Sequence, residues 1–238
     1  IRDQFGKVNQ RIILGDENKF STSTPVFAHF VADGHLLLVS LGFEVVAIDM
    51  LGSAASQEDV VWRRDLSSSS SARTGRRRLS HRSVTRPWGP TRYVLQESTR
   101  LPLGMMGPLT RNGVFCQKMR DLSCVDPLTG EVIWTRSEIP LGCDIFGDGD
   151  LLFVVPPDSA EAMVFHASDG TEAGKRYVDS QRERWFTMGR QVVACIESAD
   201  ELEMRCYDAW EQDERWKVKF DKEVKCCRVG TDEIAVMD

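Results

Sequence analysis

The feature that most constrains the fold of this chain is an internal repeat. Four segments align, and each runs through a turn, an apolar strand, a polar turn, an apolar strand, a turn that usually contains Asp, and a last strand. Gly130, Gly170 and Gln212 occupy equivalent places, and the resulting period of about 40 residues is typical of propeller blades with four strands each. Helical spacing is sustained nowhere. We therefore predict an all-β fold, a partial β-propeller with about four to five blades of four antiparallel strands.

Turn signals punctuate the apolar runs at the intervals that this fold requires. Asp33-Gly34, Asn112-Gly113 and Asp148-Gly149 each separate two short apolar stretches. These pairs favour tight hairpins, because both central positions can adopt a positive φ. The "GDGD" stretch at 147–150 is therefore predicted to be a hairpin turn and not a calcium loop, since it lacks the remaining acidic ligands and the final Glu of an EF-hand.

The repeat divides the 238 residues into units with a single interruption. The predicted units are the edge of a preceding blade at 1–25, blades at 26–66, 101–140, 141–180 and 181–220, and the start of a further blade at 221–238. Residues 67–100 are rich in Ser and Arg and poor in apolar residues, so we predict a long inserted loop there. The chain opens without Met and stops after a strand-like run, so we expect further blades in a longer protein.

One stretch, "CVDPLTGEVIW" at 124–134, contains the most specific pattern. Asp126 is expected to end the third strand of its blade and to accept hydrogen bonds from backbone N–H groups of the turn. Gly130 supplies the positive φ of the return, and Thr129 adds a local hydroxyl bond. Trp134 is expected to bury its ring against the neighbouring blade while its N–H finds a backbone acceptor. We predict that these four residues dock one blade onto the next.

The same spacing recurs in two other units. Asp208 and Trp216 stand as far apart as Asp126 and Trp134, and Asp49 and Trp62 follow the same design with extra turn residues. Two places before each Asp lies a small residue, which suggests that this place must stay small. The small residues are Ala47, Cys124 and Cys206.

The third unit departs from the pattern. His166 takes the place of the Asp, Gly170 is kept, and Gly174 replaces the Trp. We expect this blade to dock less firmly than the others.

The motif Ala/Cys-x-Asp-x-x-Thr-Gly-x-x-x-Trp resembles the tryptophan-docking motif of the PQQ-like (quinoprotein alcohol dehydrogenase-like) β-propeller repeat family. The likeness covers 26–66 and 101–238. The resemblance implies a propeller of about seven or eight blades. It also implies either an enzyme that holds pyrroloquinoline quinone and calcium over its central channel or a non-enzyme such as an outer-membrane-assembly lipoprotein.

Among these possibilities we expect a bacterial, non-catalytic member that serves as a protein-interaction scaffold or binding surface within a larger protein. Its partners would be proteins, bound through blade loops or the channel mouth, and the remaining blades of the same chain. We predict no catalytic, cofactor-binding or metal-binding residue. The net charge of −6 disfavours nucleic acid, and no apolar run approaches the roughly 20 residues of a transmembrane helix. The resemblance implies the bacterial cell envelope or periplasm.

Two alternatives stay open. One is a fragment of a PQQ- and calcium-dependent quinoprotein dehydrogenase, since Cys226-Cys227 resembles the vicinal disulfide of those enzymes. Cys143 occupies the place of Cys226 in another unit, so packed thiols explain the pair equally. The other is an extracellular polymer-binding module, because the Arg-rich run within 73–86 could attract an anionic partner. A solvated loop or a phosphorylation site at Ser80 explains the same run.

The remaining cysteines and the histidines give weaker signals. Cys116 with Cys124, and Cys195 with Cys206, would lie on adjacent strands and could approach as cross-strand pairs, although unpaired core thiols are the simpler interpretation. The four histidines are scattered without metal-ligand spacing.

Overall fold

The computed structural model describes residues 28–41, 44–51, 60–66, 79–84, 92–97, 105–157, 159–179, 184–198, 200–221, 225–229 and 233–237. Throughout these ranges the regular structure is β-strand, and no helix in them has the length and apolarity that a membrane crossing demands.

Sixteen of the strands form four sheets of four antiparallel strands each. Sheet 1 contains β1 Ala28–Asp33, β2 Leu36–Leu41, β3 Glu44–Asp49 and β4 Val60–Asp65. Sheet 2 contains β7 Met105–Thr110, β8 Gly113–Lys118, β9 Asp121–Val125 and β10 Val132–Arg136. Sheet 3 contains β11 Asp144–Gly147, β12 Leu151–Val155, β13 Glu161–His166 and β14 Glu172–Tyr177. Sheet 4 contains β15 Arg184–Met188, β16 Gln191–Glu197, β17 Glu201–Asp208 and β18 Asp213–Asp221.

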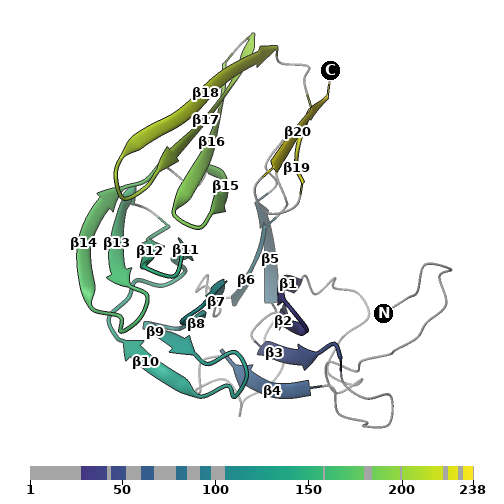
Figure 1. Ribbon diagram of the computed structural model, residues 1–238, viewed down its shortest axis with the longest axis vertical. Coiled ribbons are helices and arrows are strands. Elements are labelled where there is room, and N and C mark those ends of the chain that lie inside the picture. The colour runs from purple at the N-terminus through teal and green to yellow at the C-terminus, as the bar shows by residue number, and fades with distance from the viewer. Residues whose placement is uncertain are drawn as a thin grey trace, which may run out of the picture.

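The four sheets are arranged as consecutive blades of a β-propeller (Figure 1). The first strands β1, β7, β11 and β15 lie next to one another on the inside of the arc, and the last strands β4, β10, β14 and β18 form its outer rim. Within each sheet the strands pair in chain order. The predicted all-β fold of four-stranded antiparallel blades is confirmed.

The hydrophobic core lies between the sheets and not within any one of them. On β8, Val114 and Cys116 pack with residues of sheet 1, whereas Phe115 between them packs with residues of sheet 3. Successive side chains of a strand point to opposite faces. Because both faces of β8 are buried, its sequence is a continuous apolar run. The same arrangement joins sheets 3 and 4, where Phe153 and Val192 share a cluster.

Two further strand pairs accompany the four sheets. β19 Lys225–Val229 pairs with β20 Glu233–Met237, and Ile234 of β20 packs against the core of sheet 4. β5 Leu79–Val84 pairs with β6 Arg92–Glu97 in an antiparallel ladder. The latter pair differs from the loop expected over 67–100. Its two segments, "LSHRSV" and "RYVLQE", are short enough and contain enough Leu, Val and Tyr to pair locally, which the Ser- and Arg-rich composition around them obscures. Residues 1–27 lie outside the described residues.

Candidate functional site

The predicted docking residues lie at the boundaries between consecutive sheets. At the first boundary, Trp62 of β4 reaches the turn of sheet 2, where its Nε1 donates a hydrogen bond of 2.8 Å to the carbonyl of Pro127. The ring lies so close to Gly130 that an added Cβ there would be 2.7 Å from its Cγ atom. Gly130 adopts φ of 74°, so this position requires glycine both for its backbone and for the contact.

The second boundary repeats this arrangement. Nε1 of Trp134 donates to the carbonyl of Ala167 at 3.1 Å, and a Cβ added to Gly170 would lie 2.6 Å from Cε3 of the indole. Ala167 and Pro127 stand at equivalent places, each directly after the residue at the Asp place of the repeat, His166 and Asp126. Trp134 also contacts Phe115, with ring centroids 5.7 Å apart.

The strand register explains the small residues two places before each Asp. Trp62 pairs with Ala47, Trp134 with Cys124 and Trp216 with Cys206. A β-bulge precedes each tryptophan: the residue just before it on the outer strand has no direct partner on the third strand. The directly opposing side chain must be small because the indole turns across it toward the next sheet.

The aspartates hold the turn between the third and fourth strands. Oδ1 of Asp126 accepts hydrogen bonds of 2.8 Å from the N–H groups of both Leu128 and Thr129. These bonds favour the ionised form, and the bond from the Thr129 N–H contributes most to lowering the pKa of Asp126. Oγ1 of Thr129 in turn accepts from the N–H of Glu131 at 3.2 Å.

Asp208 and Asp49 have the same role in their turns. Oδ1 of Asp208 accepts from the N–H groups of Trp210 at 2.9 Å and Glu211 at 3.1 Å, and its Oδ2 lies 3.0 Å from Nε of Arg190. Oδ1 of Asp49 accepts from the N–H of Leu51 at 2.9 Å. The carboxylates of these turns therefore point at backbone N–H groups of their own sheet.

An arginine two residues after the tryptophan adds a second contact that sequence reasoning missed. Nη1 of Arg64 donates to the carbonyl of Gly130 at 3.5 Å, and Nε of Arg136 donates to the carbonyl of Gly170. The signal was present in the sequence, because an Arg follows Trp62, Trp134 and Gly174 at the same distance.

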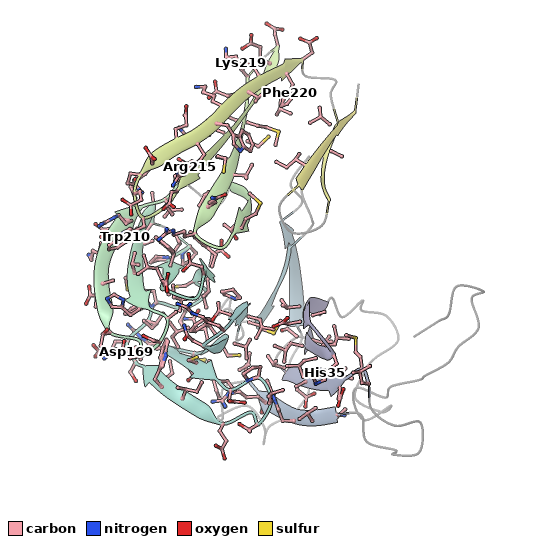
Figure 2. All side chains as sticks on the ribbon, in the orientation of Figure 1. His35, Asp169, Trp210, Arg215, Lys219 and Phe220 are labelled. Carbon is pink, nitrogen blue, oxygen red and sulfur yellow. The ribbon has the colours of Figure 1, made fainter. Side chains whose placement is uncertain are left out.

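At the third boundary, where the tryptophan is missing, different contacts replace it. A Cβ added to Gly174 would meet no atom within 4 Å. Trp210, from the turn of sheet 4, lies at this boundary instead (Figure 2). The guanidinium carbon of Arg176 lies 3.7 Å from the centroid of the Trp210 ring, and Nε of Arg176 donates to the Trp210 carbonyl at 2.8 Å.

The backbone carbonyl that would accept the tryptophan N–H at this boundary has another donor. The carbonyl of Ala209 is equivalent to those of Pro127 and Ala167, and it accepts a bond of 2.6 Å from Nε2 of Gln212. Gln212 itself has φ of 61° where the other units have glycine. We expected this blade to dock less firmly, but the contacts of Arg176 with Trp210 replace the missing tryptophan of the outer strand.

An ion pair also lies at the same boundary. Nη2 of Arg205 lies 2.7 Å from Oδ1 of Asp179, whose side chain is only 4% exposed. The N–H of Asp179 donates to the hydroxyl of Tyr207 at 2.9 Å. These polar contacts tie the segment after β14 to β17, in addition to the contact of Arg176 with Trp210 between sheets 3 and 4.

Trp216 lies at the fourth boundary. Its half-buried ring packs in the cluster that contains Met204, Cys206 and Ile234 of β20. The strand pair β19–β20 therefore shares an apolar cluster with the tryptophan of sheet 4.

The cysteines of sheets 2 and 3 are buried thiols. Burial raises the pKa of Cys116 to about 12, that of Cys124 to about 11 and that of Cys143 to about 12. Cys116 faces Ser123 in the register, so the suggested cross-strand pair with Cys124 is not formed. In sheet 4, Cys195 pairs with Met204 and Cys206 pairs with Val193, so Cys195 and Cys206 are not direct cross-strand partners. Cys226 and Cys227 pair with Val236 and Ala235 in β19–β20, and their side chains lie outside the described residues.

The inner turns form a second row of contacts between sheets. Oδ1 of Asp148 accepts from the N–H groups of Asp150 at 2.8 Å and Leu151 at 3.0 Å, as expected of a hairpin turn. Nδ2 of Asn112 from sheet 2 donates to the carbonyl of Gly149 at 2.5 Å. Over the described ranges, no three His, Cys, Asp or Glu side chains gather as a metal ion would require.

The fold and these boundaries define the chain as a β-propeller segment. No protein-family model and no curated protein sequence matches it. Among solved structures, it aligns with BamB from Moraxella catarrhalis at 14% identity and a TM-score of 0.40, over 88% of this chain and 57% of that one.

Two further structures show comparable alignments. One is the Kuenenia stuttgartiensis hydrazine synthase, at 14% identity and a TM-score of 0.46, over 95% of this chain and 58% of that one. The other is the β-propeller domain of Cps50 (Swd1) from Myceliophteria thermophila, at 14% identity and a TM-score of 0.35, over 85% and 79%. The chain spans 57% to 60% of the length of the first three structures that it matches.

Proposed function

We propose that this chain is part of a non-catalytic, PQQ-like β-propeller that acts as a protein-interaction scaffold within a larger protein. The tryptophan motif supports the family assignment, and the repeated contacts of Trp62 and Trp134 with the following sheet support a structural role for it. We assign the blade-docking role to Asp49, Trp62, Asp126, Thr129, Gly130, Trp134, Asp208 and Trp216. The family resemblance favours the bacterial cell envelope as the location.

The observation that carries this proposal is the exposed apolar rim of sheet 2. Leu128, Val132 and Ile133 are 58%, 46% and 50% exposed, and they lie in or just before β10. Asp126, in the same turn, directs its carboxylate at backbone N–H groups. Single exposed apolar residues are ordinary, whereas three within six residues of one outer turn and strand favour contact with another protein.

Site-specific cross-linking in the cells that make the longer protein tests this proposal. A photoreactive residue at Ile133 is expected to give a discrete cross-linked protein, whereas the same residue at the exposed Glu138, which lies beyond the strand, is expected to give none. Equal cross-linking from both positions, or none from either, would contradict the scaffold.

The quinoprotein alternative is tested separately with the longer protein. Adding pyrroloquinoline quinone and calcium is expected to give no bound-quinone absorption band after gel filtration. A retained band together with dye-linked alcohol oxidation would replace the scaffold proposal with an enzyme.

A further inference from the structure

The outer strand of sheet 4 differs from the other outer strands in length. β18 runs for 9 residues, whereas β4, β10 and β14 run for 6, 5 and 6. It lies along the outer margin of the arc (Figure 1). Among the strands that the structure describes, only β17 pairs with it, so its other edge is open.

The open edge of β18 is also regular. Its register with β17 runs without a shift from Trp216 to Asp221. In β10 the matching run extends only from Trp134 to Arg136. A straight edge of this kind presents a row of backbone N–H and C=O groups that another strand can pair with.

The two faces of β18 present different chemistry to an added strand. Arg215, Lys217 and Lys219 alternate on one face, with side chains 46%, 44% and 57% exposed. Figure 2 shows Arg215 and Lys219 along this strand. On the other face, Trp216 and Phe220 are half-buried and Val218 is 41% exposed.

The lysines keep donors available for a further partner. Lys217 lies 2.7 Å from Glu203 and Lys219 lies 2.6 Å from Glu201, both on β17. An ammonium group has three N–H donors, and these carboxylates lie on the inner side of the strand. An acidic side chain on an added outer strand would complete a ladder of alternating charge across three strands.

A second copy of β18 is a poor occupant of this edge in the pairing that aligns all nine residues of the strand. In an antiparallel pairing centred on Lys217, the lysine would face its own copy and Arg215 would face Lys219. Like charges directly opposite each other destabilise a sheet.

We infer that the outer edge of β18 binds an extended segment of a partner protein in which acidic and apolar side chains alternate. The segment adds as a fifth strand, its backbone pairing with β18 while its carboxylates meet Lys217 and Lys219 and its apolar side chains cover Val218. This inference rests on the proposed scaffold function and specifies one partner class for it.

A capped synthetic peptide of four Glu-Val repeats is the probe, titrated into the full chain by calorimetry. We expect saturable binding that weakens as salt is added. The double variant Lys217→Gln, Lys219→Gln should bind about tenfold more weakly, since it loses two charge pairs. Lys175→Gln is the matched control, because Lys175 on β14 lies 2.8 Å from Glu161 in the same kind of cross-strand pair. That control should bind the peptide as the unaltered chain does.

Amide hydrogen exchange provides a second readout that does not depend on the variants. Bound peptide should slow exchange within 216–221 and leave β14 unchanged, and a peptide of four Glu followed by four Val should give no such protection. The inference would be overturned if the Glu-Val repeat peptide did not bind, or if the double variant bound it as tightly as the unaltered chain. It would also be overturned if Lys175→Gln weakened binding as much as the double variant does, or if the peptide of four Glu followed by four Val protected 216–221. The cross-linking experiment at Ile133 separates the two proposals. If the peptide does not bind but Ile133 gives a discrete cross-linked protein, only the β18 inference fails. If Ile133 gives no cross-linked protein, the scaffold function is refuted.

Discussion

The guanidinium of Arg176 lies over the indole of Trp210, with 3.7 Å between the guanidinium carbon and the ring centroid. The two residues come from neighbouring sheets, and they meet at the one described boundary between four-stranded sheets that lacks a tryptophan on the outer strand. At the first two boundaries the indole belongs to the preceding sheet and the glycine to the following one. Here the indole belongs to the following sheet.

Replacing Arg176 tests this substitution of contacts. Arg176→Leu should lower the free energy of unfolding by about 1–3 kcal/mol, because it removes the cation–π contact and the bond to the Trp210 carbonyl. Arg176→Lys retains the charge and should lose less. Urea unfolding measures both, and a loss no larger for Leu than for Lys would show that the planar stack contributes nothing.

Trp134→Ala should lower the free energy of unfolding by about 2–4 kcal/mol, because the partly buried ring packs between sheets 2 and 3 and its removal leaves a gap there. Trp134→Phe preserves much of the apolar area and serves as the control. Denaturant unfolding measures the difference. A cost below about 1 kcal/mol for the alanine variant would contradict tight docking.

Gly170→Ala should be much more costly than Gly34→Ala. Both glycines have positive φ, 69° and 56°, but an added Cβ at Gly170 meets the Trp134 ring whereas at Gly34 it meets nothing within 4 Å. We expect about 1–2 kcal/mol for Gly34→Ala from backbone strain alone and about 2–5 kcal/mol for Gly170→Ala. Equal shifts in thermal unfolding would mean that the ring moves aside freely.

Asp126→Asn should reveal an acid-sensitive contribution to stability. The hydrogen bonds from the N–H groups of Thr129 and Leu128 lower the pKa of Asp126 in the folded state. A lowered folded pKa gives stability that is fully present above the unfolded value of about 3.9 and is lost as the pH falls through the folded pKa. The stability gap between the unaltered chain and the variant should therefore be constant from about pH 5 upward and shrink below about pH 4. A gap that does not vary with pH would contradict the charge-assisted turn.

Cys116, Cys124 and Cys143 should resist alkylation in the folded chain. Burial raises the pKa of each thiol, to about 12, 11 and 12, so the reactive thiolate is scarce at about pH 8 and access is blocked. Iodoacetamide labelling with peptide mass spectrometry should modify them only after denaturant is added. Rapid labelling of Cys124 without denaturant would show that the boundary between sheets 2 and 3 opens readily.

The sequence predicted the strands and turns where the same residues recur at the same spacing in successive units. The repeat of Asp126 and Trp134 at Asp208 and Trp216 predicts strands and turns, because each turn satisfies its own backbone N–H groups locally. The contacts of Arg176 with Trp210 could not be predicted in this way. They join residues that occupy unlike places in two units, so no spacing within a single unit indicates them.

The strand pair β5–β6 was missed for a different reason. Composition over 67–100 is dominated by Ser and Arg, which argues against a buried core. Pairing of two short segments needs only local alternation and backbone hydrogen bonds, and composition averaged over a long stretch does not detect either.

Trp62 and Trp134 each belong to one sheet and donate a hydrogen bond to a turn of the next sheet, so each of these contacts links two consecutive sheets. Stability in such an array is shared between nearest neighbours. A lesion at Trp134 should therefore uncouple sheets 1 and 2 from sheets 3 and 4 and divide one cooperative melting transition into two, while a lesion at a free outer edge should leave that transition single.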